Sequence, residues 1–198
     1  MKQPKPYLLL HGKSPVAIRN FMIAILVVSL VMPACKKDEK DLPPPTIVNI
    51  GDHYGGGIVF IVDDAKQHGL IAAEADQSID APWFNGTFLA TTATSNVDGD
   101  DNTKKIISAQ GNTGVYAAKL CKDYNGGGFH DWFLPSKDQL AILYLQKSFV
   151  GGFANQVYWS SSEYDVGEAW VQDFTNGDQN IDNTSDGANV HTRAIRQF

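Results

Sequence analysis

The sequence predicts an α+β domain with an antiparallel sheet, two or three helices and long loops. Segments rich in β-forming residues come first, helical periodicity follows, and β-forming segments return before residue 198. Strands and helices that are segregated along a chain in this way are typical of α+β domains, whereas parallel sheets show regular alternation. The region 50–198 has no repeat of fixed period, and about 150 residues suffice for one domain with a real core.

The first β region contains two strand-like runs, 58–62 and 70–73, which are joined by a polar turn. From residue 76 to residue 102 the chain is polar and rich in Gly and Thr, which predicts a long loop region. Trp83 and Phe84 are its expected apolar anchors.

Helical periodicity covers residues 103–110 and 115–124. A third helix is expected to begin after Ser136, because Ser136 and Gln139 have the spacing of a capping box. Cys121 falls on the apolar face of the second helix and is the one cysteine of the domain, so we expect a buried, inert thiol rather than a nucleophile or a disulfide.

The last part of the chain returns to β structure. Asn176-Gly177 is the strongest short hairpin signal, and residues 175–187 around it are polar, which predicts a loop. The β-forming segments of this region are VYWSS, EAWVQDF and NVHTRAIRQF.

The first 34 residues have the pattern of a secretory signal. Basic residues precede an apolar run at 21–32, which is short for a membrane span because spanning takes about twenty apolar residues. The alternative is an uncleaved anchor helix. The run ends in VMPAC, which resembles the lipobox of bacterial lipoproteins and implies cleavage after Ala34 and lipidation of Cys35.

Residues 35–49 are expected to form a charged, proline-rich linker. The segment Lys37-Asp38-Glu39 resembles the short export signal of Bacteroidota surface lipoproteins, although an ordinary solvated tail has the same character. DLPPPT then supplies a stiff spacer. We therefore expect an outer-membrane lipoprotein that is exposed at the cell surface and reaches the membrane through its lipid.

The charge excludes one class of partner. Residues 1–34 carry four basic and no acidic residues, so their removal changes the formal net charge from −6 to −10. Such an acidic chain repels nucleic acid at long range.

The stretch GGFHDWFLPSKDQLAILY at 127–144 contains side chains that catalysis also uses. Ser136, however, has a strong local role as a helix cap, and the surrounding aromatic and aliphatic residues have the pattern of packing anchors. We therefore interpret the stretch as structural and expect no enzymatic activity.

Two polar clusters are candidate binding sites. The loop at 96–102 offers oxygen ligands for a calcium ion, although it fails the EF-hand pattern; the alternative is a solvated acidic loop. The polar residues around the last hairpin suit a sugar, because planar amides and carboxylates bind hydroxyls and an aromatic ring stacks on the sugar; the alternative is that Trp170 points inward. The metal candidates are Asp98, Asp100, Asp101 and Asn102, and the ligand candidates are Trp170, Gln172, Asp173, Asn176, Asp178 and Asn180.

Eight ordered blocks lie between residues 51 and 198: YGGGIVFIVD, HGLIAA, AAKLCKDY, DWFLPSKDQLAILY, GGF, YWSSSEY, AWVQDFTNGDQN and RAIRQF. Together they resemble the bacterial Lcl C-terminal domain family, a family of unknown function. The resemblance implies a C-type-lectin-like fold, and some members of the family are adhesins for sulfated glycans. The Glu-Pro-Asn and Trp-Asn-Asp motifs of calcium-dependent lectins are missing here, and the charge of −10 disfavours a polyanionic glycan.

Together these observations predict a surface lipoprotein that binds carbohydrate or glycoprotein. The alternative, from a different class, is a structural or assembly component that contacts another envelope protein. Sugar binding predicts that Trp170 or Trp83 is exposed beside amides, whereas a structural role predicts that both are buried and that an apolar patch is exposed.

Overall fold

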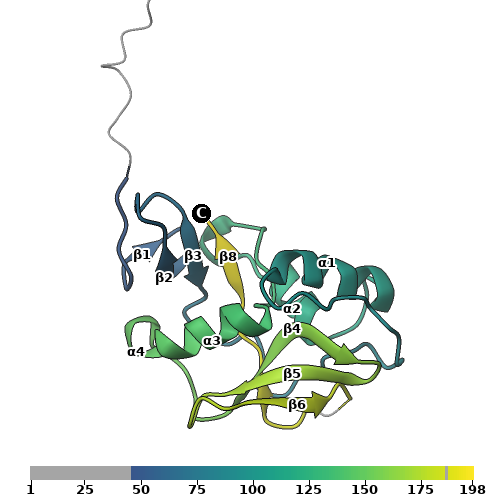
Figure 1. Ribbon diagram of the computed structural model, residues 1–198. Helices are drawn as coiled ribbons and strands as arrows, with labels where there is room; N and C mark the ends of the chain where they lie inside the picture. Colours follow the sequence, from purple (N-terminus) through teal and green to yellow (C-terminus); the bar gives the residue numbers. More distant parts are fainter. Residues whose placement is uncertain (1–45, 186) are drawn as a thin grey trace, which may run out of the picture. The chain divides into compact units, whose positions relative to one another are not determined.

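Two four-stranded sheets and four α-helices form the part of the chain that the computed structural model describes, residues 46–185 and 187–198 (Figure 1). The predicted α+β class is therefore confirmed, but the antiparallel strands are divided between two sheets. Val48 is already buried in the core, two residues before the predicted start of the domain.

The first sheet joins the beginning of the domain to its end. Its strand order is β1-β2-β3-β8, and every neighbouring pair is antiparallel. β2 and β3 match the two strands that the sequence predicts, and β8 places the C-terminal segment beside β3. The strands are β1 (His53–Tyr54), β2 (Gly57–Val62), β3 (Gly69–Ala72) and β8 (Ile195–Gln197).

The second sheet has the order β6-β5-β4-β7. β4 pairs with β5 and β5 with β6 in antiparallel fashion, whereas β4 and β7 are parallel. The strands are β4 (Val157–Asp165), β5 (Glu168–Asp173), β6 (Gln179–Asn183) and β7 (Val190–His191).

The strand β6 corrects the prediction of a continuous polar loop at 175–187. Its Gln, Asn and Asp side chains have low β propensity, so the composition of the segment does not favour a strand. Among the described residues β6 is an edge strand that pairs with β5 alone, in a register from Glu168–Asn183 to Gln172–Gln179. Tertiary pairing across the Asn176-Gly177 turn therefore overrides local propensity.

Four helices cover the sheets, where two or three were expected. The first begins four residues before the predicted start, because Asp98 caps it by accepting a hydrogen bond from the Asp101 backbone N–H. The short last helix has no strong periodic signal. The helices are α1 (Gly99–Gln110), α2 (Ala117–Asp123), α3 (Lys137–Leu145) and α4 (Lys147–Val150).

The predicted capping box at Ser136 is present at the start of α3. The Ser136 hydroxyl accepts from the Gln139 backbone N–H, and the Gln139 side chain accepts from the Ser136 N–H. Cys121 is fully buried on α2, and burial raises the pKa of its thiol well above the ordinary value. Both observations agree with the structural roles expected from the sequence.

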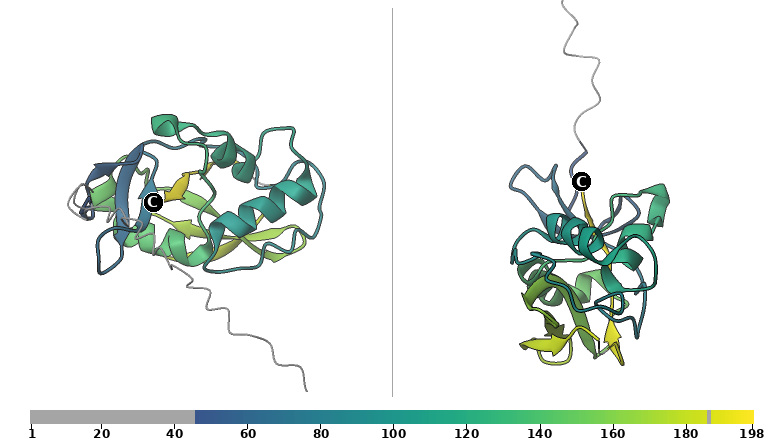
Figure 2. Two further views of the ribbon diagram at one scale, coloured as in Figure 1. Left: turned by 90° about the horizontal axis from the view of Figure 1, so that it is seen from above. Right: turned by 90° about the vertical axis from the view of Figure 1, so that its right-hand side faces the viewer.

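Helix α3 lies between the two sheets. It packs against β4 and β5 of the second sheet and against β2 of the first. Figure 1 shows α3 in this position, and the right-hand view of Figure 2 shows β8 near the top and the yellow-green strands of the second sheet at the bottom. One face of α3 therefore looks onto the β5–β6 hairpin.

Two buried tryptophans fix the long loop region against β4. The indole N–H of Trp83 donates to the Ser160 carbonyl at 2.8 Å, and that of Trp159 donates to the Ala81 carbonyl at 2.9 Å. Trp83 is only 2% exposed, as its predicted role as an anchor requires. Reciprocal bonds of this kind satisfy the polar ends of both rings within the core.

A buried charge network joins the two sheets. The Asp76 carboxylate accepts from Arg193 Nε at 2.6 Å and from the Tyr158 hydroxyl at 3.0 Å, and His191 Nδ1 lies 2.7 Å from it. The Arg193 side chain is fully buried, and it also donates to the carbonyls of Ala73 and Gly152. The network thus connects the end of β3 with β4, with β7 and with the turn after α4.

We expect Asp76→Asn to lower the free energy of unfolding by about 3 kcal/mol, because it leaves the buried Arg193 cation without its counter-ion. Urea unfolding measures the change. Asp80→Asn, which alters an exposed aspartate, is the control and should change stability by less than about 0.5 kcal/mol. Equal stability of the two variants would contradict the role of the network.

The ion pair between Asp131 and Arg196 predicts an acid-sensitive contribution to stability. Hydrogen bonds from the Arg196 guanidinium, at 2.7 and 2.8 Å, lower the pKa of Asp131 below its ordinary value of 3.8. The pKa of Asp131 is lower in the folded protein than in the unfolded chain. The ion pair therefore contributes its full stability when the pH is above the unfolded-state pKa. That stability is lost as the pH falls through the folded-state pKa.

We therefore expect the Asp131→Asn variant to lose less stability than the wild type does when the pH falls below about 4. The effect should be small, because the Asp131 side chain is 58% exposed. The measurement is the free energy of unfolding between neutral and acid pH. Asp64→Asn, at an exposed aspartate between β2 and β3, should keep the wild-type profile; identical profiles for all three proteins would refute the assignment.

Candidate functional site

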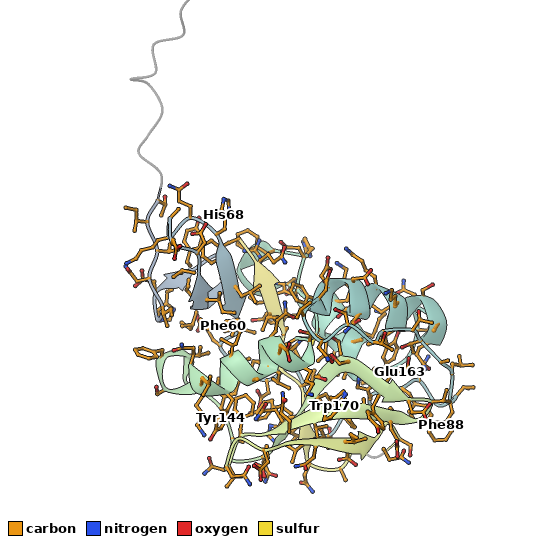
Figure 3. All side chains as sticks on the ribbon, viewed as in Figure 1. Phe60, His68, Phe88, Tyr144, Glu163 and Trp170 are labelled. Carbon is orange, nitrogen blue, oxygen red and sulfur yellow. The ribbon has the colours of Figure 1, made fainter. Side chains whose placement is uncertain are left out.

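A pocket of about 260 Å³ lies between α3 and the β5–β6 hairpin. Figure 3 shows Tyr144 and Trp170 in the region where α3 faces the second sheet. The pocket combines an aromatic ring with three planar amides, and we call it the hairpin pocket. It is lined by Ala141, Tyr144 and Leu145 of α3 and by Gln172, Asn176, Gly177 and Gln179 of the hairpin.

The turn of the hairpin is held by its own backbone. The Gly177 N–H donates to the Asp173 carbonyl, and the Asp173 N–H donates to the Asp178 carbonyl, both at 2.8 Å. Gly177 has φ +94°, and a Cβ there would lie 2.5 Å from the Tyr144 ring. Two features therefore require glycine at this position: the positive φ and the close approach of the turn to α3.

Two glutamines stand opposite each other in the hairpin, Gln172 on β5 and Gln179 on β6. Gln172 Nε2 donates to the Gly177 carbonyl at 2.6 Å, and Gln179 Nε2 donates to the Lys137 carbonyl at 3.0 Å. Gln172 is only 1% exposed, and its Oε1 has no hydrogen-bond partner among the described residues.

Tyr144 is the aromatic wall of the hairpin pocket. Its ring packs edge-on against Phe174 at 5.5 Å, and Lys147 Nζ lies 4.3 Å from the ring centre. Lys147 is held in place because its ammonium also donates to the Phe174 carbonyl at 2.6 Å. The ring is therefore fixed from two sides while it lines the pocket.

Trp170 lies two residues from Gln172 on the same face of β5. It is half-buried. Lys137 Nζ sits 3.6 Å above its ring centre, and Tyr164 packs edge-on at 5.5 Å. Trp170 thus continues the face that carries the hairpin pocket, with the Lys137 ammonium covering its ring.

The structure brings only part of the predicted ligand set together. Gln172 and Asn176 line the hairpin pocket and Trp170 adjoins it. Asp173 and Asp178 instead order the turn, by accepting from the Thr175 N–H and from Asn176 Nδ2.

Asn180 is opposite Val171 and therefore lies on the other face of the hairpin from Gln172. Sequence reasoning missed Tyr144, which was counted among the packing anchors of residues 127–144, and Gln179, which lies in the expected loop. The adjacent Asn-Gly signal was the one available clue to Gln179, because it predicts that a strand follows the turn.

The four predicted calcium ligands lie at the start of α1, where each has a contact within the protein. Asp98 caps the helix, and Asp100 and Asp101 form ion pairs with Lys104 and Lys105 one turn later. Asn102 is buried, with hydrogen bonds to the Ser95 backbone. Residues 46–185 and 187–198 contain no group of three or more His, Cys, Asp or Glu side chains placed to hold a metal ion. Calcium binding stays a prediction.

Two further predictions concern the beginning of the chain. Cys35 and the apolar run at 21–32 lie outside the described residues. No helix in the described ranges is both long and apolar enough to cross a membrane.

Comparison with known proteins gives no family for this chain. A scan against protein-family models finds no match, and a search of curated proteins finds no similar sequence. The fold and the pocket define an α+β domain with a candidate ligand site on one face of a hairpin.

We expect Asp98→Ala to lower the free energy of unfolding by about 1 kcal/mol, the usual contribution of an N-cap, because the Asp101 N–H loses its acceptor. The same loss should be measured with added calcium and with chelator. If chelator destabilised the wild type but not Asp98→Ala, a bound cation rather than the cap would be the main role of this residue.

Proposed function

We propose that this protein is a surface-exposed lipoprotein whose α+β domain binds a neutral carbohydrate, free or on a glycoprotein, in the hairpin pocket. The observation that carries the proposal is the combination in one pocket of the Tyr144 ring with the amides of Gln172, Asn176 and Gln179. Binding pockets typically join apolar and aromatic surface with a few polar groups that fix orientation.

Each part of the pocket matches one part of a sugar. The Tyr144 ring and the side chains of Ala141 and Leu145 offer apolar surface to the C–H face of a pyranose. The amides offer planar hydrogen-bonding groups to its hydroxyls. These groups stand on a helix and a hairpin rather than on long loops, which favours a fixed geometry for binding.

The charge of the surroundings supports a neutral ligand. Asp173 and Asp178 lie at the turn of the hairpin, and the chain after residue 34 carries a formal charge of −10. Lys147 and Lys137 carry two positive charges near the same turn and offset these aspartates locally, so it is the net charge of the whole chain that disfavours an anionic ligand. A sulfated or uronic-acid-rich glycan would meet net repulsion.

Resemblance to the Lcl C-terminal domain family and to C-type-lectin-like folds is consistent with this proposal. The eight sequence blocks of the resemblance include Ala141 and Tyr144 of α3 and residues 169–180 of the β5–β6 hairpin, which contribute to the pocket. In the proposal, lipid on Cys35 anchors the chain to the outer membrane and the proline-rich spacer presents the domain outward.

A second function, contact with another envelope protein, is favoured by an exposed apolar patch. Phe88 and Val166 are each 52% exposed, and they line a second pocket of about 380 Å³ at the β4–β5 turn. Tyr164 and Leu89 are also exposed nearby in the chain. Apolar surface of this kind is typical of contact sites, and Trp83 is buried as a structural role would require.

A glycan array distinguishes the two functions. The full-length chain, purified in a detergent without a sugar headgroup, is applied to neutral and anionic glycans with calcium and again with chelator. We expect binding to neutral glycans under both conditions. Binding that required calcium would move the site to the Asp98–Asn102 segment, and no binding across the array would leave the protein-partner function as the better proposal.

We expect Tyr144→Ala to weaken binding to the neutral glycans about tenfold, the loss that follows when an aromatic contact of about 1.4 kcal/mol is removed. Thermal unfolding of the variant shows whether the fold persists. Tyr54→Ala, which removes an exposed tyrosine of the first sheet, is the matched control and should bind as the wild type does. Equal losses in both variants would place the site elsewhere.

A further inference from the structure

We infer that the second sheet binds an extended, basic peptide segment of another envelope protein. The segment pairs with the free edge of β6 and places a Lys or Arg side chain in the pocket at the β4–β5 turn. The inference rests on the second function proposed above, contact with an envelope protein, and adds the chemistry and the conformation of the partner. It is independent of carbohydrate binding in the hairpin pocket.

One edge of the second sheet is open. Among the described residues β6 pairs with β5 alone, and its sequence QNIDN contains neither Lys nor Pro, the residues that commonly protect a sheet edge. The Thr184 N–H donates to the Gly167 carbonyl, so the even-numbered residues of β6 bond towards β5. The backbone groups of Gln179 and Ile181 therefore point away from β5, where an added strand can pair with them.

The pocket at the β4–β5 turn lies at one end of this edge, because Asn183 of β6 lines it and pairs with Glu168. We call this pocket of about 380 Å³ the turn pocket. It combines the exposed apolar side chains of Phe88 and Val166 with the exposed carboxylates of Asp165 and Glu168. A Lys or Arg side chain matches this combination, because its alkyl stem packs on apolar surface while its cation meets a carboxylate.

The apolar wall of the turn pocket is held in place by the protein itself. Phe88 stacks on Phe84 with ring centres 4.8 Å apart. Gly167 has φ +90°, and a Cβ there would lie 3.0 Å from the Phe88 ring, so glycine lets the ring lie against the turn. The buried Glu163 carboxylate accepts from the Thr91 N–H and hydroxyl at 3.0 Å, which ties the loop after Phe88 to β4. Figure 3 shows Phe88 at this end of the second sheet.

The charge of this part of the sheet selects a basic partner. Residues 157–185 contain six acidic residues and no Lys or Arg. The lysines of α3 and α4 lie on aromatic rings of the face that carries the hairpin pocket, and two lysines of α1 are paired with aspartates one turn away. A second copy of this chain or an anionic lipid surface would be repelled at this edge, whereas a basic segment is attracted.

The test is a selection of phage-displayed random decapeptides on the full-length chain, purified in detergent. We expect enrichment of peptides in which apolar and polar residues alternate and which carry a Lys or Arg, because alternation is the pattern of a strand with one face on the protein. Fluorescence anisotropy of a synthetic copy of the selected peptide then gives its affinity. Binding should weaken as the salt concentration rises, since salt screens the exposed carboxylates.

Two variants test the pocket and the edge separately. Glu168→Lys reverses an exposed charge of the turn pocket and should weaken binding of the selected peptide about tenfold. Asp64→Lys makes the same change of charge at an exposed aspartate between β2 and β3 and should bind as the wild type does. Ile181→Pro removes one outward N–H, which an edge strand tolerates, and should also weaken binding at least about tenfold. Ile181→Val is its control.

The outcomes separate this inference from the functions proposed above. Thermal unfolding shows whether Ile181→Pro keeps the fold, and Glu168→Lys decides the matter if it does not. The inference fails if no basic peptide is enriched, if Glu168→Lys binds as tightly as Asp64→Lys, or if a folded Ile181→Pro variant binds as tightly as Ile181→Val.

Enrichment of acidic or uncharged peptides that Phe88→Ala no longer binds would refute the basic chemistry, while contact with a protein partner would stand. If no peptide of any kind is enriched, the inference fails together with the second function. Carbohydrate binding is measured separately on the glycan array and does not depend on either result.

Discussion

The buried bond between Asp76 and Arg193 is the contact on which the arrangement of the two sheets depends. Asp76 follows the last strand of the opening segment, and Arg193 lies between β7 and β8 at the other end of the chain. A fully buried guanidinium has to find acceptors inside the protein, and it finds them at Asp76 and at the carbonyls of Ala73 and Gly152. Because these groups come from distant segments, the charge is satisfied only when all of them have assembled.

The network reaches the hairpin pocket through a row of aromatic rings. Tyr158 donates to Asp76, and burial raises the pKa of its phenol, so it remains a donor at neutral pH. Its ring packs on Phe174 at 4.3 Å, and Phe174 in turn packs on Tyr144 at 5.5 Å. The wall of the pocket is thus supported by rigid contacts from the core. A site supported in this way keeps its geometry without a ligand, which lowers the entropic cost of binding.

Local signals predicted the elements that depend on local chemistry. The spacing of Ser136 and Gln139 predicted the start of α3, and the Asn176-Gly177 pair predicted the turn, because caps and tight turns are built from neighbouring residues. The polar strand β6 was missed because its stability comes from pairing with β5. Of the candidate ligand residues, Gln172 and Asn176 reach the pocket and Trp170 adjoins it, whereas Asn180 faces the other side of the hairpin.

The sequence by itself determined the α+β class, the strands β2 and β3, the start of α3 and the burial of Cys121. Each follows from periodicity, capping or turn chemistry within a few residues. The tertiary structure alone decided that the strands form two sheets, that Tyr144 lines a pocket, and that Gln172 is buried with its Oε1 unpaired. Those features depend on which groups meet across the fold, and a hydrogen-bond partner that is missing can be recognised only when all neighbours are in place.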